Sequence, residues 1–104
     1  MTTWKQAERE IAKRLGGIRQ PVNGRGLSAD IAHQWMAPEV KHRDKAFPKW
    51  ITKAHEQAEQ AAKHHPNADK FPILPVSIIH QKGQPYDDCM VQIRLSDFVS
   101  FFVK

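Results

Sequence analysis

The chain has 104 residues, the common size of a single domain with a modest but adequate core. Hydrophobic residues make up 40% of it and charged residues 26%, a composition typical of soluble globular proteins and not of disordered chains. The 16 Lys and Arg outnumber the 11 Asp and Glu, and the net charge of +5 favours an anionic partner, first of all nucleic acid.

Several other classes are excluded. The apolar stretches are a few residues long, far short of the roughly 20 needed to span a membrane, and the opening residues contain no apolar signal region, so we expect a cytoplasmic protein. The single cysteine, Cys89, rules out a disulfide framework, and we expect it to pack as a small apolar side chain. The six histidines form no HExxH motif, and we expect surface or helix-capping positions for His33, His42, His64 and His65.

In chain order, the first predicted element is a helix over residues 3–15. Its apolar side chains recur at helical spacing, a threonine at position 2 or 3 can cap its start, and the pair Gly16 and Gly17 ends it. Residues 18–27 follow as a loop rich in Arg, Gly, Pro and Asn, which suits contact with phosphate groups.

Two strands are predicted next, over residues 27–33 and 35–42, with a tight connection between them. Pro38 favours an edge or a bulge in the second strand. The clearest helix follows over residues 48–64, because Pro48 suits a first turn and apolar side chains line one side.

The last part of the chain predicts two more strands, over residues 73–80 and 89–95, and a short final helix capped by Ser96 and Asp97. That helix carries an aromatic cluster which either closes the core or forms a homodimer surface. The predicted order is α-β-β-α-β-β-α, an α/β fold in which helices cover a mixed sheet, within a single domain over residues 1–104.

Two carboxylates and a lysine of the first hairpin form the most informative group. Glu39 and Lys41 point to the same face of a strand, and a turn near His33 places Asp30 opposite Ala37, as a diagonal neighbour of Glu39 at roughly 7–8 Å. Such carboxylates can share a Mg²⁺ or Mn²⁺ ion while the lysine orients or deprotonates a water, which is the chemistry of phosphodiester hydrolysis. The alternative is a solvated edge hairpin with a surface ion pair.

Each of the first two helices also places one polar residue inside its apolar stripe. On a helical wheel Glu8 lies among the apolar side chains of the first helix, and Gln57 lies in the middle of the stripe of the second. A buried carboxylate is costly unless it is paired or bound to metal. The alternatives are a Glu8 paired with a nearby arginine and a Gln57 amide satisfied by the backbone.

Basic residues flank the acidic group on both sides. We expect a track for the DNA backbone, although such runs are often only a solvated face. The expected DNA-binding residues are Arg19, Arg25, His42, Arg43, Lys45 and Lys49.

Four short segments occur in a characteristic order: AEREI at residues 7–11, RQPVNG at 19–24, ADI at 29–31 and EVKHR at 39–43. Together they resemble the PD-(D/E)xK nuclease superfamily, and most of all archaeal-type Holliday junction resolvases and their phage relatives. The resemblance spans about residues 5–60 and implies a restriction-endonuclease-like core, in the host cytoplasm for a phage-encoded chain.

The resemblance also implies roles for individual residues. Asp30, Glu39 and Glu8 would bind the metal, and Lys41 would be the catalytic lysine. Two further positions would support the site: Asn23, near a loop serine of the family that contacts the phosphate region, and Gln57, at a helix glutamine seen in several branches.

We therefore expect a Mg²⁺-dependent DNA endonuclease, with Mn²⁺ able to substitute, that acts as a homodimer on branched DNA in recombination or repair. One alternative keeps the site but changes the substrate, to a restriction-like, nicking or repair nuclease on linear or damaged DNA. The other is a basic module that binds DNA or a partner without catalysis.

Overall fold

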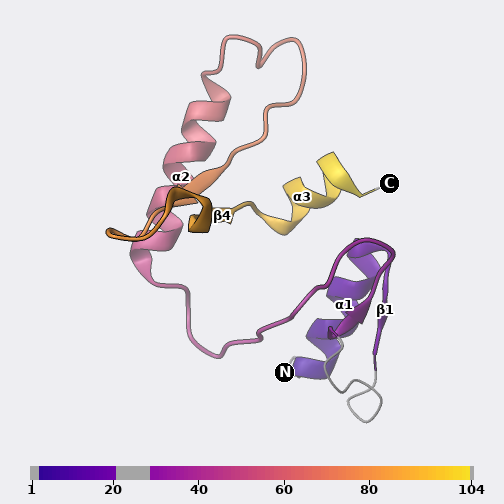
Figure 1. Cartoon of the computed structure of the whole chain (residues 1–104). Coiled ribbons are helices and arrows are strands. Elements are labelled where there is room, and N and C mark those ends of the chain that lie inside the picture. Colours follow the sequence, from indigo (N-terminus) through magenta and orange to yellow (C-terminus); the bar gives the residue numbers. More distant parts are fainter. Residues whose placement is uncertain (1–2, 21–28, 104) are drawn as a thin grey trace. The chain divides into compact units, whose positions relative to one another are not determined.

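The computed structural model describes residues 3–20 and 29–103, and it divides the chain into two compact units (Figure 1). The first unit comprises the described residues up to Lys45 together with Val103, and the second spans Ala46–Phe102. The protein is a small mixed α/β protein, and its described residues form three α-helices and two two-stranded antiparallel sheets. Within the described ranges no helix is both long and apolar enough to cross a membrane.

Helix α1 (Trp4–Leu15) opens the first unit, and the prediction for it is confirmed. Thr3 caps its start, since Thr3 Oγ1 accepts the Gln6 N–H at 3.1 Å while Gln6 Oε1 accepts the Thr3 N–H at 2.9 Å. The helix ends at Gly16, which adopts a left-handed conformation with φ 74° and so closes the last turn.

A two-stranded sheet packs against this helix. Strand β1 (Ile18–Arg19) pairs antiparallel with β2 (Ile31–Ala32), in a register that sets Arg19 opposite Ile31. The buried apolar side chains of the unit are Ala12, Leu15 and Ile31. The prediction of a loop over residues 18–27 is therefore wrong at its start, because residues 18–19 form a strand too short to show an alternating pattern.

The predicted pairing of 27–33 with 35–42 is also wrong: β2 pairs with β1, and no strand forms over 35–42. Pro38 has no N–H to give to a ladder, and the Asp30 side chain takes the N–H of Val40. The chain still folds back beside Asp30, because the Asp30 N–H donates to Pro38 O at 3.1 Å.

The second unit continues the predicted order of elements. Helix α2 is confirmed and starts after Pro48. The two strands of this unit are shorter than predicted, because only the residues towards the turn between them pair, Ser77–Ile79 with Met90–Gln92. The final helix begins before the predicted cap, since the Phe98 N–H already donates to Arg94 O. The elements are α2 (Lys49–Lys63), β3 (Ser77–Ile79), the 3-10 helix η2 (Tyr86–Asp88), β4 (Met90–Gln92) and α3 (Leu95–Phe102).

Two further expectations are corrected here. The order of element types matches α-β-β-α-β-β-α, but β1 and not the predicted strand over 35–42 supplies one of the first two strands. The strands form two separate antiparallel sheets and not one mixed sheet. On α2 the inward face centres on His55, which is buried, whereas Trp50 is 58% exposed and Gln57 is exposed. The predicted apolar side of this helix is therefore only partly covered: Ala54 and Ala58 are half-buried, whereas Trp50 and Ala61 are exposed.

Gly17 offers a test of the packing between α1 and β2. A Cβ at this position would lie 2.6 Å from Ala32 O and 2.7 Å from Ile31 Cγ2. We expect Gly17→Ala to lower the free energy of unfolding by about 1–3 kcal/mol, because the backbone of β2 must move to admit the methyl group. Urea unfolding followed by circular dichroism measures this, and an unchanged midpoint would contradict the close approach.

Candidate functional site

A buried ion pair joins α1 to β1. Glu8 is 4% exposed, as its place in the apolar stripe predicts, and its Oε1 accepts a hydrogen bond from Arg19 Nε at 2.9 Å. The alternative of a nearby arginine partner for Glu8 is thus realised. Charge-assisted bonds of this kind offset the cost of taking a carboxylate out of water.

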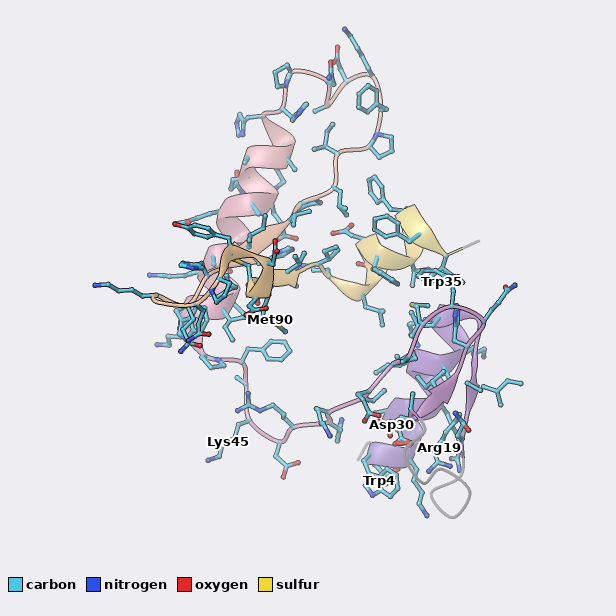
Figure 2. The ribbon with its side chains drawn as sticks, viewed as in Figure 1. Trp4, Arg19, Asp30, Trp35, Lys45 and Met90 are labelled. Atoms are coloured by element: carbon cyan, nitrogen blue, oxygen red, sulfur yellow. The ribbon has the colours of Figure 1, made fainter. Side chains whose placement is uncertain are left out.

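Arg19 also lies over an aromatic ring. Its guanidinium carbon is 5.4 Å from the centroid of the Trp4 ring, a favourable cation–π distance. Figure 2 labels Trp4, Arg19 and Asp30 in the first unit. Arg19, which was expected to bind DNA, therefore has internal partners on α1.

Asp30 organises the segment that follows β2. Its Oδ2 accepts the Val40 N–H at 2.7 Å, and its own carbonyl accepts the Gln20 N–H at 2.9 Å. Because Gln20 follows Arg19 directly, the backbone next to the Glu8 partner is bonded to the backbone of Asp30. The half-buried Asp30 thus lies between β1 and residues 38–40.

Glu39 and Lys41 flank Val40, and both are exposed. The Asp30 bond to the Val40 N–H therefore places the Asp30 carboxylate beside the backbone that carries both side chains, at the position where the sequence predicts a shared site. The three expected metal ligands do not converge on one point. In the described part of the chain, the carboxylate oxygens of Glu8, Asp30 and Glu39 do not all lie within 4.8 Å of one another.

The other predicted residues are dispersed. Asn23 and Arg25 lie outside the described residues. Gln57 points to solvent from α2, so the expectation of an inward amide is wrong. The remaining basic residues are exposed, and none forms an ion pair with another described residue; they are His42, Arg43, Lys45 and Lys49.

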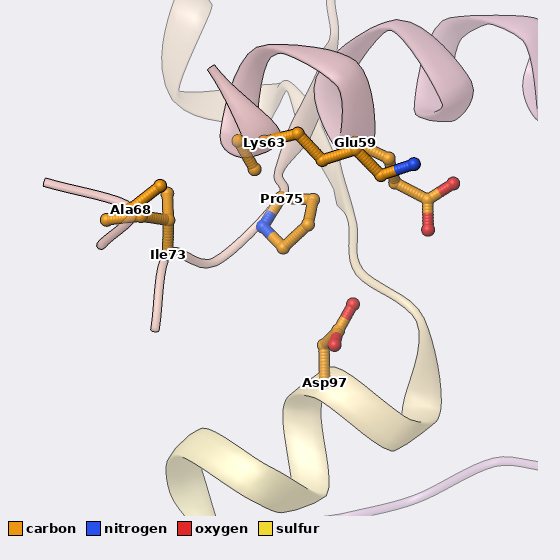
Figure 3. Close-up of a pocket in the computed structure, with 7 residues that line it drawn as sticks. Glu59, Lys63, Ala68, Ile73, Pro75 and Asp97 are labelled. Carbon is orange, nitrogen blue, oxygen red and sulfur yellow. The ribbon is translucent and has the colours of Figure 1, made fainter. Parts of the chain in front are cut away.

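A second polar group, not anticipated from the sequence, lies in the second unit. His55 and Glu59 on α2 and Asp97 on α3 each bring a ligand atom within 4.8 Å of the other two. The available signal was the spacing of His55 and Glu59, four residues apart and hence on one face of a helix. Figure 3 shows Glu59 and Asp97 at an open pocket of about 340 Å³.

Two interactions hold this group in place. His55 is 5% exposed and its Nδ1 lies 2.7 Å from Ser77 Oγ on β3. Arg94 binds Glu59 through two hydrogen bonds, Nε to Oε2 at 2.7 Å and Nη2 to Oε1 at 3.1 Å. The hydrogen bonds from Arg94 lower the pKa of the Glu59 carboxyl, and the same bonds raise the pKa of Arg94.

Two histidines have the capping role that was expected of them. His33 Nε2 donates to Leu15 O at 2.8 Å, at the end of α1, and His64 Nδ1 donates to Gln60 O at 2.9 Å, at the end of α2. His65 is exposed, and Cys89 is half-buried and carries a free thiol. His42 is exposed as well, so the surface positions expected for His42 and His65 agree with the structure.

Comparisons of the chain with protein-family models, with curated proteins and with solved structures found no match. The resemblance to nucleases therefore rests on the ordered segments of the sequence.

The Glu8–Arg19 pair generates a stability prediction. We expect Arg19→Met to lower the free energy of unfolding by about 3 kcal/mol, because it removes the arginine partner of a buried carboxylate. The double variant Glu8→Met with Arg19→Met should recover most of the loss, since it removes both charges. Urea unfolding of both variants checks this; equal stability of Arg19→Met and wild type would contradict it.

Proposed function

We propose that this protein is a metal-dependent DNA endonuclease, most similar in its site to Holliday junction resolvases. One observation carries the proposal: the 2.7 Å bond from the Val40 N–H to Asp30 Oδ2, which sets the aspartate beside the Glu39–Lys41 segment. These are the residues that the ordered sequence segments single out, and the fold-back of the chain at residues 38–40 brings Asp30 beside that segment.

The residues of the first unit suit a divalent metal of the Mg²⁺ type by their chemistry. Asp30 and Glu39 offer carboxylate oxygens, the ligands that Mg²⁺ and Mn²⁺ prefer, and Glu8 offers a third after exchange of its Arg19 partner. Bound there, the ion would supply positive charge to the scissile phosphate and acidify a water.

The other residues would act on the water and the DNA. Lys41 is exposed and adjacent to the Asp30 contact, so its ammonium can orient the attacking water. His42, Arg43 and Lys45 are exposed and would bind backbone phosphates, which carry no sequence information. We infer recognition by shape, with branched DNA as substrate and a homodimer to cut two strands.

The test is cleavage of a four-way junction and of a matched linear duplex, with Mg²⁺, Mn²⁺ or a chelator. We expect cleavage that needs the metal and prefers the junction, and Glu39→Ala or Lys41→Ala to slow it by at least about 100-fold, because each removes a ligand or a proton-handling group. Equal rates on the two DNAs would indicate a restriction-like, nicking or repair nuclease.

Glu10→Ala is the matched control for these variants. Glu10 is an exposed glutamate of α1 that pairs only locally with Arg14, so its loss should leave cleavage unchanged. Absence of metal-dependent cleavage on junctions, flaps and duplexes would refute the proposal, as would a Glu39→Ala variant as active as wild type.

A second candidate is a basic module that binds DNA without cutting it. The observation that favours it is the separation of the three carboxylates, which do not gather at one point in the described residues. It predicts DNA binding that persists without divalent ions and survives alanine at Asp30 and Glu39. Arg43→Ala with Lys45→Ala should then weaken binding and lower the salt slope of log affinity by about 2, measured by fluorescence anisotropy.

A further inference from the structure

The polar group of the second unit has the composition of a transition-metal site. It combines one imidazole with two carboxylates, and a ligand atom of each lies within 4.8 Å of the others. His55 and Glu59 share one face of α2, and Asp97 comes from the first turn of α3. An ion held by all three would join these two helices.

The two ring nitrogens of His55 have different surroundings. Nδ1 is held by Ser77 Oγ at 2.7 Å, whereas Nε2 is buried and has no hydrogen-bond partner among the described residues. In the tautomer in which Nδ1–H donates to Ser77, Nε2 carries the lone pair that a metal takes. A hydrogen bond from the other ring nitrogen to an oxygen is the usual support of a metal-bound histidine.

A second buried nitrogen lies near the same place. Gln92 stands opposite Ser77 in the register of β3 and β4, and its Nε2 is also without a partner among the described residues. Buried polar atoms are rarely left unsatisfied, so His55 Nε2 and Gln92 Nε2 can each take a partner from outside the chain. The Gln92 amide can donate to the oxygen of a water carried by the ion.

Two basic side chains compete with a metal ion at this place, and one of them already binds a proposed ligand. Arg94 holds both carboxylate oxygens of Glu59, and Lys63 lines the same pocket. The Arg94 side chain is 51% exposed, so its guanidinium can leave Glu59 and turn to solvent, and no unpaired buried arginine remains. Because Glu59 and Asp97 line an open pocket, an ion can reach them from solvent (Figure 3).

We propose that His55, Glu59 and Asp97 bind a divalent transition-metal ion, with Zn²⁺ as the preferred ion, and that Arg94 occupies Glu59 when the ion is absent. Imidazole nitrogen favours Zn²⁺ over Mg²⁺, which prefers oxygen ligands alone. The three ligands leave a fourth position for water. This site lies in the second unit and does not depend on the proposed nuclease site of the first.

The experiment titrates the full chain, first freed of metal with a chelator, with Zn²⁺ in a calorimeter and with Co²⁺ in a spectrophotometer. We expect one Zn²⁺ per chain whose binding depends on His55, and a Co²⁺ absorption band of a nitrogen and oxygen site. Any heat with Mg²⁺, which the proposed nuclease site would take up, should be the same in wild type and in His55→Gln. His55→Gln and Asp97→Asn should each weaken Zn²⁺ binding at least tenfold. Arg94→Gln should strengthen it, because it frees Glu59.

The control is the double variant His64→Gln with His65→Gln, which removes two exposed neighbouring histidines able to bind Zn²⁺ adventitiously. It should bind as wild type does. Binding that this variant abolishes, or that His55→Gln and Asp97→Asn leave unchanged, would overturn the proposal, as would the absence of saturable binding. If circular dichroism shows that His55→Gln does not fold, the Zn²⁺ affinities of Asp97→Asn and Arg94→Gln test the proposal instead, since these positions are not buried.

Discussion

The first unit depends on a carboxylate that replaces a strand partner. Asp30 Oδ2 takes the Val40 N–H at 2.7 Å, while its backbone bonds Gln20 on one side and Pro38 on the other. Asp30 thereby links the residue after β1, the start of β2 and the returning chain. A hydrogen bond to a charged acceptor is stronger than a neutral ladder bond, so a short bridge can do what a strand would otherwise do.

The same residue is the centre of the proposed chemistry, and this creates a competition. An oxygen of Asp30 or Glu8 that accepts from a protein N–H would have to be shared with the proposed metal, and Glu8 already holds Arg19. A metal ion must bind these carboxylates at least as strongly as the N–H groups of Arg19 and Val40 do. The double charge of a divalent ion strengthens its attraction to a carboxylate. The second unit repeats the pattern, because Arg94 holds Glu59 where an ion would lie.

Local signals explain which elements were predictable. Helix α1 carries its capping box and its glycine stop within the helix and its flanks, and α2 follows Pro48, so both were found from sequence. The pairing of β1 with β2 was missed because it joins residues separated along the chain and involves only two residues on each side. Strands this short leave no period to detect.

For the candidate sites, helical spacing predicted that Glu8 is buried. The closeness of Asp30 to the Glu39–Lys41 segment was expected from a hairpin that does not form, and it comes instead from the bonds of Asp30 to Pro38 and Val40. Which side of α2 faces inward was decided only by tertiary structure, since α2 carries apolar residues on more than one side and β3 packs on the side of His55. The helical pattern therefore predicts an inward Gln57, which is exposed, and gives no sign that His55 is the buried residue. The sequence by itself determined the helices and the basic charge. The strand positions and partners of the first unit and the His55 group arose from contacts distant along the chain, which no local pattern records.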